Sequence, residues 1–255
     1  MKYLKYLQTS NDFESFKNSE DYVLPNVSYV VETKEVSFDP YIPPLGVDSI
    51  PNEASIYGID GRFYTPEEWV KSGNSNEDAV GVAFCKLNND GTYECPPFVI
   101  HPSEGANLKY SKKQETISSV TKTGEYTEAI KDFNGEKNTK YIVQNDDRWN
   151  GGSSGTGPGY ANGITFKHGK KGYVPAAGEL YYMIAWNSEL HPHYQKINEC
   201  LNAINGTPLD RNKEYWSSTS GGEKFSAWIW DDGTKSMLIS GNKTAQKYVR
   251  AIAKL

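Results

Sequence analysis

The sequence lacks long apolar runs. None of the hydrophobic stretches in its 255 residues reaches the roughly 20 residues that a membrane-spanning helix requires. Residues 1–8 begin with a charge, are interrupted by Lys5 and then turn polar, so the apolar core of a signal peptide is missing. We therefore expect a protein that is made in the cytoplasm without a signal peptide and is not inserted into a membrane.

Cysteine is also scarce. The three residues of this type, Cys85, Cys95 and Cys200, are an odd number, which does not indicate a disulfide framework. Cys85 and Cys95 flank the turn at 88–91 and could face each other across a hairpin, so a disulfide between them stays open. Reduced thiols are the expectation for a chain made in the cytoplasm.

Neither sign of charge is concentrated in long runs. Lys and Arg number 27 and Asp and Glu number 32, so the formal net charge is −5. A nucleic-acid partner would require a basic patch or stripe, and none is visible. The chain is poor in the Ala, Leu, Glu and Lys bias of helical bundles, whereas 13% of it is aromatic and 23 residues are Gly. This composition, rich in strand and turn formers, predicts a loop-rich α+β fold.

Catalytic and metal-binding patterns are weak. The cluster His191-Pro192-His193 has Pro between its two rings and no Cys or acid constellation nearby, which favours a polar loop over a metal site. The turns at 88–91 and 231–233 offer oxygen ligands without the spacing of a calcium loop, although a structural calcium ion stays open. Residues 151–155 match G-x-S-x-G, but no apolar strand precedes them and no helix is expected directly after them. We therefore expect no catalytic residue, no metal and no cofactor.

Residues 1–45 are expected to form a small N-terminal element. A short capped helix is predicted at 10–16, one or two strands at 27–38 and a stiff, Pro-rich linker at 39–44. So small an element cannot bury a core alone, and we expect it to pack on the main domain or on other copies of itself. The main domain is predicted to cover residues 46–255.

The main domain alternates strand and helix signals. Thr65, followed by Pro66 and two acids, predicts an N-cap and the start of a short helix. Apolar runs at 79–85 and 98–101 predict strands, and the Gly and Ser content of 150–163 predicts a surface loop. Helices are expected at 127–133, at 138–143, from about 180 and at 194–204, the last two with apolar faces toward the sheet.

The C-terminal stretch, residues 213–255, is predicted to form a three-stranded antiparallel unit. Its aromatic-apolar segments are separated by small and polar residues, and Asp231-Asp232-Gly233 supplies a tight turn. Neighbouring side chains of a strand point to opposite faces. Trp228 and Trp230 are therefore expected inward, as buried framework together with Trp216, and Ile229 and Asp231 outward.

Several motifs of the main domain resemble a known family. They are Tyr215-Trp216-Ser217-Ser218-Thr219, Ala227-Trp228, Gly233 and Tyr248-Val249-Arg250-Ala251, preceded by Gly172-Tyr173-Val174-Pro175-Ala176-Ala177-Gly178-Glu179-Leu180. In combination they resemble the C-type-lectin-like variable proteins that diversity-generating retroelements target. Three further segments, at 64–69, 79–83 and 132–135, look similar to members from gut bacteria and their phages. That family is related in fold to the formylglycine-generating, sulfatase-modifying proteins. The resemblance covers about residues 56–255.

The resemblance implies a C-type-lectin-like domain with mixed antiparallel sheets, two flanking helices and long loops. It also implies a non-enzymatic protein that displays diversified side chains from about 213–255 on a fixed scaffold. In that family diversification acts at adenines, typically in Asn codons, and leaves Trp codons unchanged. The residues that fit this repertoire are the candidate ligand-binding set, namely Ser220, Gly221, Gly222, Phe225, Ser226, Ile229, Asp231, Thr234, Ser236, Leu238 and Ser240.

The expected partner is then a protein or glycan on a target cell surface. The N-terminal element would mediate attachment or homo-oligomerisation, on the virion if the chain is phage-encoded, and several copies would add avidity. Two alternatives stay open. A formylglycine-generating-type enzyme would need a pair of active-site cysteines or a metal site near the C-terminus, and residues 213–255 contain no Cys. A structural surface or fimbrial tip protein would be favoured by a signal peptide.

Overall fold

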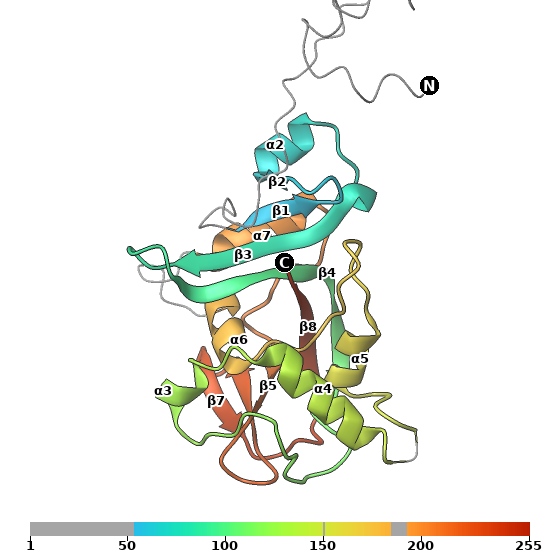
Figure 1. The fold of residues 1–255 in the computed structure, drawn as a ribbon, viewed down its shortest axis with the longest axis vertical. Coiled ribbons are helices and arrows are strands. Elements are labelled where there is room, and N and C mark those ends of the chain that lie inside the picture. The colour runs from blue at the N-terminus through green and yellow to red at the C-terminus, as the bar shows by residue number, and fades with distance from the viewer. Residues whose placement is uncertain (1–53, 150, 185–192) are drawn as a thin grey trace, which may run out of the picture. The chain divides into compact units, whose positions relative to one another are not determined.

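The computed structural model describes residues 54–149, 151–184 and 193–255 (Figure 1). The N-terminal element predicted for residues 1–45, with its helix and strands, lies outside the described residues, as do His191 and Pro192. These expectations stay predictions, and so does the domain boundary near residue 45.

Within the described residues, the strands form one sheet in the order β2-β1-β3-β4-β8-β5-β6-β7. Neighbouring strands are antiparallel except β5 and β8, which are parallel. The strands are β1 (Ser55–Gly58), β2 (Phe63–Tyr64), β3 (Ala79–Leu87), β4 (Tyr93–Leu108), β5 (Tyr215–Ser220), β6 (Ala227–Asp231), β7 (Ser236–Ser240) and β8 (Lys247–Lys254). This mixed sheet with its flanking helices is the α+β fold that the sequence predicts.

The C-terminal strand β8 lies inside the sheet, between β4 and β5. Strands β5 and β6 pair antiparallel, as predicted, and β7 pairs antiparallel with β6. The third aromatic-apolar segment of the predicted unit, β8, pairs with β5 in parallel, through Tyr215 and Tyr248. The prediction that the segment at 248–251 joins this unit antiparallel is wrong, because residues 241–246 carry the chain from the outer strand β7 back past β6 and β5. Arg250 holds β8 there, since its buried guanidinium donates to the carbonyls of His101 and Pro102 at 3.0 and 2.9 Å.

The helices are α2 (Pro66–Lys71), the 3-10 helix η2 (Asn76–Asp78), α3 (Tyr126–Ala129), α4 (Gly135–Asp146), α5 (Gly157–Gly163), α6 (Ala177–Ile184) and α7 (His193–Ala203). Thr65 caps α2 as predicted: its Oγ1 accepts from the Glu68 N–H at 3.2 Å, and the Glu68 carboxylate accepts from the Thr65 N–H at 2.8 Å. Helices α6 and α7 are the two flanking helices that the apolar periodicity predicts.

An apolar layer covers each face of the sheet. On one side Leu180 of α6 and Ile197 of α7 belong to a core that includes Trp230. On the other side Ile142 of α4 belongs to a core that includes Trp216, and α5 lies beside β8 while α4 lies beside β5 (Figure 1). The strands β5, β6 and β8 are therefore buried on both faces, and Trp216, Trp228 and Trp230 are buried framework as predicted.

A helix, α5, lies within the segment predicted to be a surface loop. Thr156 is its N-cap, because Thr156 Oγ1 accepts from the Gly159 N–H at 3.2 Å, and Pro158 stands in its first turn. The Gly and Ser content suggested a loop, and the cap and the Pro were the helix signals that this interpretation overlooked.

The helix predicted at 127–133 is shorter, since α3 ends at Ala129. Asp132 is the reason: its carboxylate accepts from the backbone N–H and from the side-chain amide of Asn134, at 3.0 and 2.8 Å. This local bonding favours a turn over a continued helix, and α4 begins directly after it.

The three cysteines are buried free thiols. Lys86, and not Cys85, lies opposite Cys95 in the β3–β4 hairpin. The disulfide that the sequence left open is therefore not formed.

Candidate functional site: the β6–β7 hairpin

The β6–β7 hairpin places most of the predicted ligand-binding strand residues on one face. The cross-strand pairs are Asp231 with Ser236, Ile229 with Leu238, and Ala227 with Ser240. Side chains of paired residues lie on the same face of a sheet. We call Asp231, Ser236, Leu238 and Ser240, which are exposed or half-buried, the β7 face.

The opposite face of the hairpin is the framework. Trp228 and Trp230 are buried, and their indole N–H groups donate to the carbonyls of Thr123 at 2.8 Å and Arg211 at 3.3 Å. Each indole is thus fixed by packing and by a hydrogen bond, which is the usual state of a buried Trp. The predicted alternation along β6, with Trp228 and Trp230 on one face and Ile229 and Asp231 on the other, is therefore correct.

Ile229 is the exception on the displayed side, and its predicted outward exposure is wrong. It is 3% exposed and packs in the core that contains Trp216 and Val249. The reason is that α4, α5 and the chain around Tyr110 cover this face over β5 and β6. Among the described residues, the elements that cover this face end before β7, at the edge of the sheet, where Leu238 is exposed.

The loop before β6 contains displayed and structural residues. Phe225 is 38% exposed and Gly222 is half-buried, but Ser220, Gly221 and Ser226 are buried. The Ser226 carbonyl accepts from the Gly221 N–H at 2.8 Å. Display at these three positions is therefore contradicted, because their atoms form the loop itself.

The backbone of Gly221 also lies close to the Ser226 side chain. A Cβ on Gly221 would overlap the Ser226 Oγ, so this position has no room for a larger residue. Ser226 Oγ in turn accepts from the Glu223 N–H at 3.1 Å. Side chains at the two positions can vary only if the loop changes shape.

The turn after β6 is closed by Asp231. Its Oδ2 accepts from the Thr234 N–H at 2.7 Å and from the Thr234 hydroxyl at 2.9 Å. The Thr234 backbone N–H is the main reason that the pKa of Asp231 lies below its usual value. Thr234 itself is exposed. Asp231 is half-buried, and its carboxylate stabilises the turn by accepting these two hydrogen bonds.

An acidic group borders the β7 face. Carboxylate oxygens of Glu214, Asp231 and Asp232 lie within 4.8 Å of one another. Glu214 accepts from the Lys247 ammonium at 2.7 Å, and Asp231 accepts from Thr234. Since two of the three carboxylates already have partners, the group is explained by the turn and by the ion pair with Lys247.

Asp132 anchors the β5 strand beneath this region. The carboxylate is buried and accepts from the Thr219 hydroxyl at 2.6 Å and from the Asn138 amide at 3.0 Å, which joins β5 to α4. Asp132 is not among the site residues predicted from the sequence. The signal was present in the spacing of an Asp and an Asn two residues apart at a helix start.

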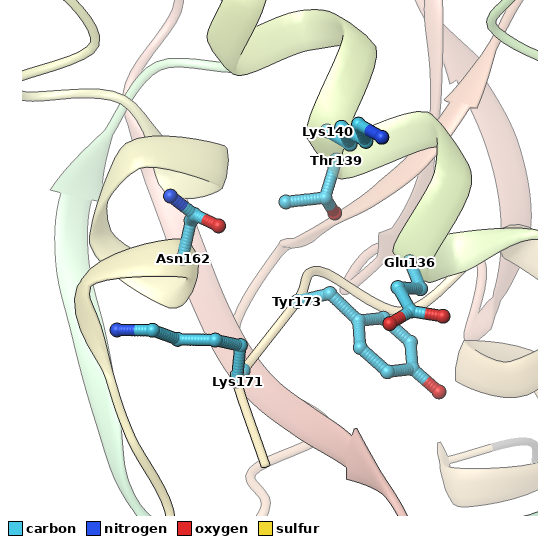
Figure 2. Close-up of a pocket in the computed structure, with 7 residues that line it drawn as sticks. Glu136, Thr139, Lys140, Asn162, Lys171 and Tyr173 are labelled. Atoms are coloured by element: carbon cyan, nitrogen blue, oxygen red, sulfur yellow. The ribbon is translucent and has the colours of Figure 1, made fainter.

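A cavity of about 270 Å³ lies away from the hairpin, beside α4 (Figure 2). Thr139 of α4, Asn162 of α5 and the ring of Tyr173 face it, and Lys171 extends along its edge. Lys171 already donates to the Thr165 hydroxyl at 2.9 Å. None of the predicted ligand-binding residues lines this cavity.

Comparison with known proteins adds a likeness of fold. No family model and no curated protein matches the chain. The crystal structure of a fimbrial protein from Bacteroides ovatus is similar to it, with a TM-score of 0.55 and 15% sequence identity, over 79% of this chain and 48% of that one. The chain thus spans about half the length of the fimbrial protein.

Among the described helices, none combines the length and the apolar character that crossing a membrane requires.

Proposed function

We propose that this chain is a non-enzymatic binding protein displayed on a surface, and that the β7 face holds a protein or glycan of a target cell. The proposal rests chiefly on one contrast: Leu238 is exposed on an edge strand, while the strand beside it is buried on both faces. A rigid core next to an open edge allows side chains to change without loss of the fold. An exposed apolar side chain flanked by Ser and Asp suits a contact surface.

The thiol chemistry supports a binding protein over a formylglycine-generating-type enzyme. Burial raises the pKa of Cys85, and raises that of Cys200 to about 12. A buried thiol that keeps its proton is a poor nucleophile and a poor metal ligand. Incubation of the purified chain with a Cys-containing peptide and oxygen tests this, since formation of formylglycine would contradict the proposal.

The hairpin supplies a matched pair of variants for testing the β7 face. Leu238 and Ile239 are adjacent and almost equally exposed, at 41% and 40%, but Ile239 pairs with Trp228 and so lies on the opposite face. We expect Leu238→Asp to weaken binding by about tenfold or more, because it places a charge in an apolar contact. Ile239→Asp should leave binding within about twofold of the wild type if the contact is confined to the β7 face.

Binding would be measured with the labelled full-length chain on a glycan array and on suspended gut bacterial strains by flow cytometry. Thermal unfolding would confirm that both variants are folded. Equal loss of binding in the two variants would contradict the assignment to one face. Wild-type binding by Leu238→Asp would reject the β7 face altogether.

We also propose that the chain is a variable protein of a diversity-generating retroelement and that residues 1–45 attach it to a virion or join several copies. The nucleotide neighbourhood tests the first part: a near-identical template repeat and a reverse-transcriptase gene should lie beside the coding sequence. Sedimentation equilibrium of the full chain tests the second part, and a monomer at all concentrations would argue against oligomerisation.

A structural appendage protein is the second candidate, favoured by the likeness of fold to the Bacteroides ovatus fimbrial protein. A subunit of this kind would assemble into filaments without a separate ligand. Electron microscopy of the concentrated chain distinguishes the two functions, because filaments would favour the appendage and dispersed particles that bind cells would favour the binding protein.

A further inference from the structure

A cationic pocket lies at the C-terminal end of α4, apart from the β7 face. It has a volume of about 380 Å³ and is lined by Lys112, Lys113, Arg148 and Trp149. Trp149 is 37% exposed, which is unusual for the largest side chain. Three cations and an exposed indole therefore share one depression on a chain whose net charge is −5.

The pocket is organised around one buried acid, Asp146. Its Oδ1 accepts from the backbone N–H of Lys112 at 3.0 Å, and its carbonyl accepts from the backbone N–H of Trp149 at 2.9 Å. Lys112 and Trp149, which are 37 positions apart in the sequence, are thus both hydrogen-bonded to Asp146. Two sides of the pocket are in place before any ligand arrives.

The glycine-rich segment that follows Trp149 completes this arrangement. Gly152 donates to the Trp149 carbonyl at 2.9 Å and has a φ of +53°, a conformation that favours glycine. The next residue, Ser153, donates its backbone N–H to Asp147 Oδ1 at 3.0 Å. The match to a nucleophile motif at 151–155 is therefore explained by a turn that borders the pocket.

The charges of this pocket are available for a ligand. Within the described part of the chain, Lys112, Lys113 and Arg148 form no ion pair. The Lys113 ammonium lies 3.1 Å from the centroid of the Trp149 ring, which fixes a positive charge over the indole. Among the described residues that line the pocket, none carries a carboxylate.

We propose that this pocket binds an anionic sugar residue, carboxylated or sulfated, within a glycan. The planar guanidinium of Arg148 matches a carboxylate or sulfate with two parallel hydrogen bonds, and the lysines add charge. The exposed part of the indole provides an apolar surface for the C–H groups of a sugar ring. Pockets of about 300–1,000 Å³ suit small ligands. The inference concerns a second site and does not depend on the β7 face.

Other anions fit less well. A nucleic acid would require a longer basic stripe along its phosphates, and the pocket has three cations in one depression. An acidic peptide would supply carboxylates, but it would make little use of the exposed part of the Trp149 indole. The peptide is therefore included as a competing probe.

The experiment measures binding of four probes to the full chain by calorimetry and saturation-transfer NMR, at low and at high salt. The probes are a hyaluronan tetrasaccharide, which is carboxylated, a heparin-derived tetrasaccharide, which is sulfated, a neutral oligosaccharide of equal length and an oligoglutamate peptide. We expect one or both acidic sugars to bind at least about tenfold more tightly than the neutral one, and to weaken as salt rises. The two acidic sugars distinguish a carboxylate from a sulfate ligand.

Three variants locate the site. Arg148→Gln and Trp149→Ala should each weaken binding by about tenfold. Lys137→Gln removes one positive charge from α4, outside this pocket, and should change affinity by less than about twofold. Arg148 is exposed, so its replacement is expected to leave the fold intact, and circular dichroism checks this.

The proposal is overturned if neither acidic sugar binds at millimolar concentration, or if binding survives both Arg148→Gln and Trp149→Ala. It is also overturned if oligoglutamate binds as tightly as the sugars, because the pocket would then select charge alone.

Discussion

Leu238 and Ile229 lie directly opposite each other in the β6–β7 hairpin, yet Leu238 is 41% exposed and Ile229 only 3%. The two side chains share a face of the sheet, so their difference comes from what lies over that face. The core built with α4 covers Ile229 and ends before β7. The region open to a ligand is therefore one strand wide, together with the loop around Phe225 and the turn at Thr234.

Truncation of the two side chains should separate stability from binding. We expect Ile229→Ala to lower the free energy of unfolding by about 2–5 kcal/mol, because it leaves a cavity in a buried cluster. Leu238→Ala should lower it by less than about 0.5 kcal/mol, as for most exposed positions. Urea titration followed by Trp fluorescence measures both, and similar midpoints for the two variants would contradict the asymmetry of the hairpin.

Two adjacent glycines of the loop before β6 should differ in tolerance. Gly221→Ala should cost about 1–3 kcal/mol, because its Cβ would overlap the Ser226 hydroxyl. Gly222→Ala is the control, since its Cβ would lie 3.4 Å from the Gly124 Cα, an ordinary contact. Thermal unfolding compares them. A stable Gly221→Ala variant would show that the loop adapts, and position 221 would return to the set of displayable residues.

The register of the hairpin could be predicted from the sequence because it depends on a local rule. Alternation along β6 separates Trp228 and Trp230 from Ile229 and Asp231, and the structure has this register. Burial could not be predicted in the same way. Ile229 is covered by elements that come from much earlier in the chain, and no periodicity within a strand reports on them.

Other features of the fold also divide into those that depend on local sequence and those that depend on contacts between distant segments. The cap of α2 at Thr65 and the apolar faces of α6 and α7 are local signals, and they were predicted. The parallel placement of β8 depends on a long connection past two strands. The pocket at Trp149 depends on the hydrogen bond from the Lys112 N–H to the Asp146 carboxylate, which joins parts of the chain 34 positions apart, and no local pattern in the sequence predicts it.

Glu179 should make the stability of the fold depend on pH in an unusual direction. The carboxyl is buried, accepts from the Ala176 N–H at 2.6 Å and lies 3.1 Å from the Tyr173 hydroxyl. Burial raises the pKa of Glu179 from the ordinary value of 4.5 to about 8. Between these two values the unfolded chain has lost this proton while the folded chain keeps it. The folded state binds more protons, so the contribution of Glu179 to the free energy of unfolding falls as pH rises.

Replacement by a group that does not titrate should remove this contribution. In Glu179→Gln, the side-chain oxygen can still accept from Ala176, but no proton is released, so stability should fall less between about pH 5 and about pH 8 than in the wild type. Urea midpoints at the two pH values measure the difference. Glu223→Gln, at an exposed position, removes one acid without changing the buried site and should follow the wild type. If Glu179→Gln and the wild type lose stability in parallel, the buried carboxyl is ionised in the folded protein, and its partners must then be stabilising a charge and not a neutral acid.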